Sequence, residues 1–300
     1  MELADKIGKL KKERQAVILA HNYQRPEVQD IADYTGDSLG LSLQAAQTDA
    51  KIIIFCGVHF MAETAKILSP DKTVLMPDIH AGCPMADMIT AEALKKLKAQ
   101  HPQALVVSYV NTPAEVKAES DYCCTSANAV KVVNAVPLDK EIIFTPDQYL
   151  GNYVEKQTGR KLILWPGYCN VHTRIMPEDV AKAKKAHPKA VVMAHPECPP
   201  QVLALADEIL STGGMLKFAK GSTAQEFIVV TEVGIIHQLN KANPDKTFYP
   251  VAENIICPNM KLITLEKVLW SLEELKEAVI VPEDITKRAK KAIDRMLELA

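Results

Sequence analysis

The sequence contains one residue pattern three times, and this internal repeat limits the fold more than any other feature. Five positions of each copy stay in register without a gap and carry residues of related chemical kind. They are His21, Tyr23, Val28, Asp33 and Ser38 in the first copy, Tyr109, Asn111, Val116, Asp121 and Ser126 in the second, and His195, Glu197, Val202, Asp207 and Thr212 in the third. The copies follow one another by 88 and 86 residues. Such self-similarity predicts one structural unit used three times.

A cysteine lies at the end of each copy, just beyond a short apolar run that ends at proline. Cys169 follows Cys83 by 86 residues and precedes Cys257 by 88, so the cysteines have nearly the period of the repeat. We therefore predict three repeats of about 85 residues, at 1–83, 84–169 and 170–257. Residues 258–300 have no counterpart in the repeat, and we expect their helices to complete the first unit or to cover a central cavity.

Each unit alternates predicted helices with short apolar strands. Helices are predicted at 1–14, 61–68, 91–99, 150–157, 177–186, 235–241, 262–277 and 285–299, with a strand-like segment at 278–281 between the last two. Strands are predicted at 16–20, 52–55, 74–77, 105–109, 142–144, 162–166, 191–194, 227–230 and 248–250. In each unit, a helix through the repeated valine and aspartate and then a short second strand are predicted after the first strand. Alternation without hairpin signals predicts parallel sheets covered on both faces. The fold class is therefore α/β, with three homologous three-layer αβα sandwiches.

Polar residues follow equivalent strands in the three units, and ligands bind at the carboxyl ends of parallel strands. The residues after the first strands are His21, Tyr109 and His195, those after the second strands are Ser38, Ser126 and Thr212, and those after the fourth strands are Cys83, Cys169 and Cys257. A pseudo-threefold arrangement would bring all nine to one central cavity.

Hydroxyl residues open the helices after the second strands, at Asp37-Ser38, Thr125-Ser126 and Ser211-Thr212. Ser, Thr and Asp are preferred N-caps, and a helix N-terminus also attracts phosphate or carboxylate. Both roles can hold at once. His101 and His187 each precede a proline that stops a helix, and they are predicted to be C-terminal caps rather than ligands.

The composition excludes several classes of protein. The chain of 300 residues has a net charge of −2, so it lacks the basic excess expected for binding nucleic acid or an anionic membrane. It has neither a membrane-spanning apolar run nor a signal peptide, and we expect a cytoplasmic protein. Its seven cysteines are then thiols or metal ligands rather than disulfides. Outside the period of the repeat, Cys56, Cys123 and Cys124 are predicted to be buried, whereas Cys198 lies beside the candidate site.

Three convergent cysteines leave several interpretations open. Structural zinc sites usually contain close ligand pairs, which these cysteines lack. A [4Fe–4S] cluster bound by three thiolates leaves one iron without a protein ligand. That iron could act as a Lewis acid in a dehydration. The third interpretation is three unrelated buried thiols.

Ten short motifs along the whole chain resemble those of the quinolinate synthases. They are AHNYQ (20–24), QDIAD (29–33), GDS (36–38), FMAE (60–63), YVN (109–111), TSANAV (125–130), CNVH (169–172), HPEC (195–198), STG (211–213) and NMK (259–261). The resemblance implies a transferase of de novo NAD biosynthesis that condenses iminoaspartate with dihydroxyacetone phosphate to quinolinate, releasing phosphate and water. It also implies three αβα domains around a pseudo-threefold axis, and an imine supply from an aspartate-oxidising enzyme.

Carried over to this sequence, the resemblance implies that Cys83, Cys169 and Cys257 bind one [4Fe–4S] cluster. It implies that His21, Ser38, Tyr109, Asn111, Ser126, His195, Glu197 and Thr212 line the substrate cavity. Some longer family members have additional cysteines near the third ligand, but here Pro258-Asn259-Met260 follows Cys257. Thiol–disulfide regulation is therefore not transferred to this chain.

The chemistry of the residues adds candidate proton donors and acceptors near neutral pH. We assign proton transfer to Glu197, with His21, Tyr23, Tyr109 and His195 as donors or relays. Each has an ordinary structural interpretation: satisfied loop histidines, a packed strand-end tyrosine, or a carboxylate at a helix entry. His172 either supports the cluster or takes part in catalysis. His59, His80 and His237 have no counterparts and are predicted to be structural or exposed.

Two other functions fit three thiolates around one cavity. An aconitase-like hydro-lyase would turn over a hydroxy acid alone, without a triose phosphate. A non-catalytic iron–sulfur oxygen sensor would turn over no substrate and would need a partner-binding surface. The polar residues at equivalent strand ends in all three units favour the condensing enzyme over both.

Overall fold

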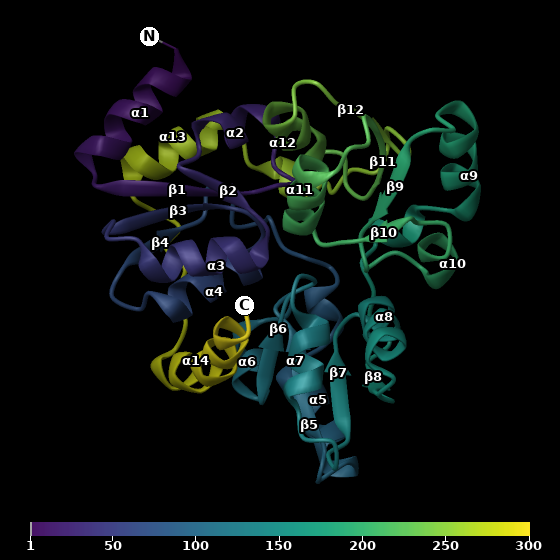
Figure 1. Cartoon of the computed structure of the whole chain (residues 1–300). Helices are drawn as coiled ribbons and strands as arrows, with labels where there is room; N and C mark the ends of the chain where they lie inside the picture. The colour runs from purple at the N-terminus through teal and green to yellow at the C-terminus, as the bar shows by residue number, and fades with distance from the viewer. Residues whose placement is uncertain (1) are drawn as a thin grey trace.

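Three parallel sheets of four strands each form the framework of the computed structural model, which describes residues 2–300. The sheets have the strand orders β2-β1-β3-β4, β6-β5-β7-β8 and β10-β9-β11-β12, which is one topology used three times. Figure 1 shows the first sheet at the upper left, the second at the bottom and the third at the upper right. The predicted α/β class, with three αβα units of three layers each, is confirmed.

The strands agree with the apolar runs of the sequence. They are β1 Ala16–His21, β2 Tyr34–Gly36, β3 Ile52–Cys56, β4 Thr73–Leu75, β5 Leu105–Tyr109, β6 Tyr122–Cys124, β7 Ile142–Thr145, β8 Ile163–Leu164, β9 Val191–Ala194, β10 Glu208–Ile209, β11 Glu226–Val230 and β12 Thr247–Pro250. The central strands β1, β5 and β9 are almost entirely buried because helices cover both faces of each sheet.

The helices alternate with the strands. They are α1 Leu3–Glu13, α2 Pro26–Ile31, α3 Ser38–Gln47, α4 His59–Leu68, α5 Ala91–Gln100, α6 Ala114–Ala118, α7 Ala129–Ala135, α8 Gln148–Thr158, α9 Pro177–Ala186, α10 Pro200–Leu203, α11 Thr212–Gly221, α12 Ile235–Ala242, α13 Leu265–Glu274 and α14 Glu283–Glu298. Three short 3₁₀ helices complete the set: η1 Ala86–Met88, η2 His172–Arg174 and η3 Met260–Leu262. No helix in residues 2–300 is long and apolar enough to cross a membrane.

The repeated aspartate makes the same pair of hydrogen bonds in each unit. Its backbone N–H donates to the carbonyl of a first-strand residue, and its carboxylate accepts from the N–H of that residue at 2.8 Å. The pairs are Asp33 with Ile18, Asp121 with Val106, and Asp207 with Val192. These bonds tie the segment before the second strand to the first strand, so the sequence register reflects a structural equivalence.

Helix caps follow the prediction in two units and depart from it in the second. Asp37 and Ser211 accept hydrogen bonds from the backbone N–H groups of Gly40 and Gly214, so they cap α3 and α11. In the second unit α7 begins only at Ala129, because residues 125–128 form a turn closed by the Asn128 side chain. His101 and His187 occupy the predicted C-cap positions of α5 and α9.

The C-terminal helices contact two units rather than one. Helix α13 packs on α1 and β3 of the first unit, as expected, whereas α14 packs mainly on α6 and β6 of the second. Figure 1 shows α14 beside α6, away from α13. The strand-like segment at 278–281 is not a strand, because its only ladder contact is an isolated antiparallel bridge between Ala278 and Leu75. The segment instead leads the chain from α13 to α14.

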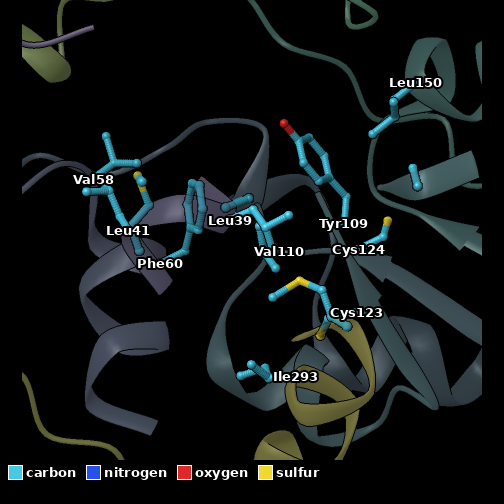
Figure 2. Packing of buried hydrophobic residues seen from close by; sticks show 14 of the residues in the cluster. Leu39, Leu41, Val58, Phe60, Tyr109, Val110, Cys123, Cys124, Leu150 and Ile293 are labelled. Carbon is cyan, nitrogen blue, oxygen red and sulfur yellow. The ribbon is translucent and has the colours of Figure 1, made fainter. Parts of the chain in front are cut away.

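A continuous hydrophobic core joins the first two units (Figure 2). Leu41 and Phe60 of the first unit share this core with Val110 and Cys123 of the second and with Ile293 of α14. The predicted burial of Cys56, Cys123 and Cys124 is confirmed, and Cys198 is also buried. The core therefore fixes the positions of adjacent units, on which the shape of the site between them depends.

Candidate active site

One cavity lies where the three units meet, and every residue that the sequence singled out for catalysis, substrate binding or metal binding lines it. It comprises about 730 Å³ of atom-free space, part of it open to solvent. The lining includes Cys83, Cys169, Cys257, His21, Tyr23, Ser38, Tyr109, Asn111, Ser126, His195, Glu197 and Thr212. The predicted convergence of equivalent strand ends on a central cavity is thus observed, and the chemical role of each residue stays a prediction.

The three cavity cysteines have the same local geometry. Each precedes a 3₁₀ helix by three residues, so η1, η2 and η3 follow Cys83, Cys169 and Cys257. In each turn the backbone N–H groups of the second and third following residues lie near the thiol and lower its pKa. Burial has the larger, opposite effect and raises the pKa of the Cys83 thiol to about 12. Hydrogen bonds to sulfur stabilise a thiolate when a cation supplies the opposing charge.

The spacing of these donors suits a multi-metal cluster better than a single ion. The compact group of donor atoms within 4.8 Å of one another consists of Cys169, His172 and Glu197, and it excludes Cys83 and Cys257. Three thiolates on one zinc at about 2.3 Å would have sulfur atoms only about 4 Å apart. The Cys83 thiol is nevertheless close enough to influence the pKa of Cys169, and Cys257 influences that of Cys83. At least two of the three sulfur atoms are therefore more than 4.8 Å apart, which is too far for one zinc ion and compatible with a larger cluster.

Glu197 is the electrostatic centre of the cavity wall. Its Oε1 accepts a hydrogen bond from the Tyr109 hydroxyl at 2.5 Å, and its Oε2 lies 2.8 Å from His172 Nδ1. Burial alone would raise the pKa of Glu197, but His172, His195 and these hydrogen bonds together hold it well below its usual range. Glu197 is consequently an ionised carboxylate in a buried site.

His172 connects this carboxylate to one cavity cysteine and to the wall formed by the third unit. Its Nδ1 lies 3.2 Å from Cys169 Sγ, and its Nε2 lies 2.7 Å from Thr231 Oγ1. Thr231 in turn shares a 2.5 Å hydrogen bond with the Tyr23 hydroxyl. The ring also stacks on His195 with 4.7 Å between centroids. His172 therefore contacts Cys169 and, through Thr231, is linked to Tyr23. The two roles that the sequence left open for His172, support of a cluster and participation in catalysis, are thus compatible.

The neighbouring histidines are held in their neutral form. Burial lowers the pKa of His21 and of His195 to about 3, although the Glu197 carboxylate opposes the shift. Burial and the Glu197 charge raise the pKa of Tyr23 and of Tyr109 well above the usual value. At neutral pH the neutral imidazoles of His21 and His195 and the protonated phenols of Tyr23 and Tyr109 thus surround the Glu197 carboxylate.

Two helix N-termini from different units meet at the cavity. The Ser211 hydroxyl, at the start of α11, donates to Asp37 Oδ2 at the start of α3, at 3.2 Å. A side chain at Gly213 would place a Cβ only 2.6 Å from the same oxygen, so glycine permits this approach. Ser38 and Thr212 are the first helical residues, and their hydroxyls lie beside free backbone N–H groups that favour anions.

Asn111 and Ser126 extend the polar surface from the second unit. Asn111 Oδ1 is buried without a hydrogen-bond partner among residues 2–300, which leaves an acceptor for a ligand. The Ser126 hydroxyl is close enough to Tyr109 to lower the pKa of its phenol, against the larger effect of burial. Thr212 Oγ1 accepts a hydrogen bond from Asn22 Nδ2 at 2.9 Å, which orients the hydroxyl.

One cavity residue, Glu232, and one residue bonded to the cavity wall, Thr231, were missed by the sequence reasoning. Thr231 and Glu232 follow β11, the third strand of its unit, and Glu232 lines the cavity. The rule about carboxyl ends of strands could have found them, but it was applied only to first, second and fourth strands. His59, His80 and His237 lie outside the cavity lining, as expected, and His237 pairs with Asp30 at 2.9 Å.

Comparison with known proteins gives one consistent result. Residues 5–298 match the family described as quinolinate synthetase A protein. The chain is 57% identical over 297 residues to a quinolinate synthase of Dehalococcoides mccartyi strain CBDB1, covering 99% of this chain and 98% of the relative. It is 57% identical over 296 residues to quinolinate synthase 1 of Methanosarcina acetivorans, covering 99% and 97%, and 55% identical over 297 residues to a quinolinate synthase of Geobacter metallireducens, covering 99% and 97%.

Proposed function

The chain belongs to the quinolinate synthetase A protein family, and we propose that it condenses iminoaspartate with dihydroxyacetone phosphate to form quinolinate, with loss of phosphate and water. The observation that carries this proposal is the convergence of three cysteine turns and three sets of polar strand ends on one cavity. The product would enter the synthesis of NAD, and an enzyme that oxidises aspartate would supply the unstable imine. The seven free cysteines suit the reducing cytoplasm, where we place the reaction.

We assign Cys83, Cys169 and Cys257 as the ligands of one [4Fe–4S] cluster. Their matching turns, the N–H groups near each sulfur and the spacing beyond that of a single-ion site support this assignment. When bound, such a cluster supplies one iron without a protein ligand, which can act as a Lewis acid toward a substrate oxygen.

The converging N-termini of α3 and α11 are the proposed binding site for the anionic groups of the substrates. Both substrates carry negative charge, and the Ser38 and Thr212 hydroxyls add donors to the free backbone N–H groups there. A phosphate held in this place would also leave with its developing charge stabilised. Asn111 and Ser126 complete the lining on the side of the second unit.

Proton transfer is assigned to the group around Glu197. The ionised carboxylate can accept a proton that the condensation removes, and Tyr109, which donates to it at 2.5 Å, can carry a proton toward the substrate. Neutral His21 and His195 each accept a backbone N–H at Nδ1, from Tyr23 at 3.2 Å and from Glu197 at 3.4 Å, which leaves the Nε2–H of each ring as a donor for the cavity. Tyr23, bonded to Thr231, provides a second protonated hydroxyl.

The test begins with protein purified without oxygen. Iron and acid-labile sulfide are counted per chain, in the parent and in Cys83→Ala, Cys169→Ala, Cys257→Ala and, as a buried-cysteine control, Cys56→Ala. We expect about four of each in the parent and the control, a loss in the other three variants, and quinolinate formation only where the cluster is present.

The outcome also separates the alternative functions. Turnover of a hydroxy acid alone would indicate a hydro-lyase, and a loaded cluster without turnover of either kind would indicate a sensor. A parent protein that binds zinc, or no metal after anaerobic reconstitution, would contradict the proposed cluster.

A further inference from the structure

A buried ion pair lies where the Cys257 turn meets the first unit. Lys261 Nζ is 3.0 Å from Glu232 Oε1, and the two side chains are 18% and 0% exposed. Glu232 lies two residues after β11, and Lys261 lies within η3, four residues after Cys257. A charge pair this deeply buried is stable only when its remaining hydrogen-bonding positions are also filled.

Glu232 fills those positions with backbone groups of its own unit. Its Oε1 also accepts a hydrogen bond from the Cys257 backbone N–H at 3.2 Å, and its Oε2 accepts one from Gly234 N–H at 2.7 Å. The carboxylate thus holds the main chain of Cys257 while it neutralises Lys261. Any shift of this carboxylate would move the Cys257 turn with it.

Lys261 extends the contact to the first unit. Its ammonium group donates to the backbone carbonyl of Tyr23, and its own carbonyl accepts from Arg25 Nε at 2.9 Å. Tyr23 and Arg25 belong to the loop that follows His21, the last residue of β1. We call residues 22–25 the first loop. The Cys257 turn and the first loop are therefore connected through Lys261 and Glu232.

Gly234 shows how closely these groups are packed. A Cβ added there would lie 2.7 Å from Lys261 Nζ, 2.8 Å from Glu232 Oε2 and 2.9 Å from the Tyr23 backbone carbon. No larger residue fits without moving one of the three. Gln29 closes the same junction from the other side, because its Nε2 donates to the carbonyls of Asn22, Gln24 and Gly234.

The complete pair occurs in one unit only, although the fold is repeated three times. Four residues after the cysteines of the first and second units stand Asp87 and Thr173 in place of lysine. Two residues after their third strands stand Val58 and Asp147. Asp147 is buried like Glu232, and the nearby Cys169 N–H lowers its pKa against the larger effect of burial. The repeat thus contains a counterpart of the carboxylate but none of the ammonium that reaches a neighbouring unit.

We propose that Lys261 and Glu232 are a positioning pair that couples the Cys257 turn to the first loop. The pair holds Cys257, a proposed cluster ligand, at a fixed position relative to the side of the substrate cavity formed by His21 and Tyr23. This inference rests on the proposed function for its purpose, but the contacts that carry it join residues of this chain to one another. Neither residue needs to touch substrate for the pair to act.

The variants are Lys261→Met, Lys261→Arg, Glu232→Gln and, as a matched control, Lys267→Met. Lys267 donates to the Leu262 carbonyl of the same turn at 2.8 Å and pairs with Asp78, yet it does not contact Tyr23 or Cys257. The full chain is examined first without cluster. Alkylation rates of Cys83, Cys169 and Cys257 are measured by peptide mass spectrometry, and backbone hydrogen exchange is measured in the first loop.

We expect Lys261→Met to raise both the Cys257 alkylation rate and exchange in the first loop roughly tenfold, a change equivalent to about 1.4 kcal/mol of local stability. Cys83 and Cys169 should keep their rates, Lys261→Arg should restore most of the parent behaviour, and Lys267→Met should leave the first loop unchanged. In the loaded enzyme Lys261→Met should raise KM and lower kcat together, because both the substrate loop and the cluster ligand move.

Equal effects of Lys261→Met and Lys267→Met on the first loop would overturn the inference, since the lysine would then be merely structural. If Lys261→Met exposes all three cysteines by unfolding, Glu232→Gln decides, because glutamine keeps an acceptor for the Cys257 N–H but removes the charge facing Lys261. If the coupling exists, Glu232→Gln must increase hydrogen exchange in the first loop without a general increase over the chain. No such increase would mean that the coupling is absent. A parent without cluster or quinolinate formation would contradict the proposed function alone, because alkylation and exchange still report on the junction.

Discussion

Replacing Tyr109 by phenylalanine and Glu197 by glutamine, singly and together, tests whether the two side chains transfer protons as one unit. Their hydrogen bond is 2.5 Å long, buried and made to an ionised acceptor. A bond of this type contributes about 1.5–3 kcal/mol. A positioned acid or base contributes about 10²–10⁴-fold in rate. Each single variant should therefore lower kcat by about 10²-fold or more.

The double variant distinguishes cooperation from independent roles. If Tyr109 carries the proton that Glu197 accepts, the double variant should be about as slow as the slower single variant, because residues that act as a unit are strongly non-additive. Independent roles would multiply the two losses. The assay is anaerobic steady-state formation of quinolinate, with iron content measured for every variant so that cluster loss is not mistaken for lost chemistry.

Tyr153→Phe is the control, because Tyr153 is only half buried and lies on α8 outside the cavity lining. It should keep the parent rate. If the two losses in kcat multiply in the Tyr109→Phe/Glu197→Gln protein, Tyr109 and Glu197 do not act together in proton transfer. A Tyr109→Phe enzyme with full activity would refute the reasoning in the same way.

Three further predictions concern stability. Burial lowers the pKa of His195 to about 3, so the unfolded state takes up a proton before the folded state does, and stability is lost as pH falls below about 6.5. His195→Asn should therefore reduce the slope of the apo-protein's unfolding free energy against pH by about 1.4 kcal/mol per pH unit near pH 5.5. An unchanged slope would contradict a neutral His195 imidazole. Asp207→Ala should cost about 1–3 kcal/mol in denaturant unfolding, because it leaves the Val192 N–H without its carboxylate acceptor. Ile293→Ala should cost about 2–5 kcal/mol by the same measurement, whereas Ile280→Ala, at 84% exposure, should change it by less than about 0.5 kcal/mol.

The sequence was sufficient for the parts of the fold that depend on local pattern. Apolar runs located the first and third strands of each unit most clearly, because helices bury these inner strands on both faces. The helix predicted through the repeated valine and aspartate is only partly right. Helices α2, α6 and α10 contain the valine but end before Asp33, Asp121 and Asp207, because each aspartate bonds to the first strand instead. Strand ends then indicated the cavity, since parallel topology places them on one edge of each sheet.

Contacts between units could not be predicted in the same way. Helix α14 packs on α6 and β6, and nothing in its own periodicity states which apolar surface it will cover. The bond between Tyr109 and Glu197 joins strand ends whose distance depends on how the second and third units dock. Thr231 gave no signal through the repeat, because its counterparts are Gly57 and Pro146. Glu232 has an acidic counterpart in the second unit, Asp147, but Val58 in the first, so the carboxylate is not repeated in all three units.

The differences between units therefore contain information that the similarities do not. A threefold repeat places equivalent backbone at three sites around one cavity, which suits a cofactor held by one cysteine from each unit. The proposed reaction is not symmetric, because two different substrates must meet in one orientation. Chemical asymmetry must then come from positions where the repeat is broken. Tyr109 faces Glu197, which has no acidic counterpart in the other units, and Lys261 faces Tyr23 from a position occupied elsewhere by Asp87 and Thr173. On this argument, exchanging Lys261 for threonine, the residue of the second turn, should leave the fold, Cys83 and Cys169 in place while it loosens the first loop and the Cys257 turn. A protein in which the exchange has no effect on that loop would show that the broken symmetry is incidental.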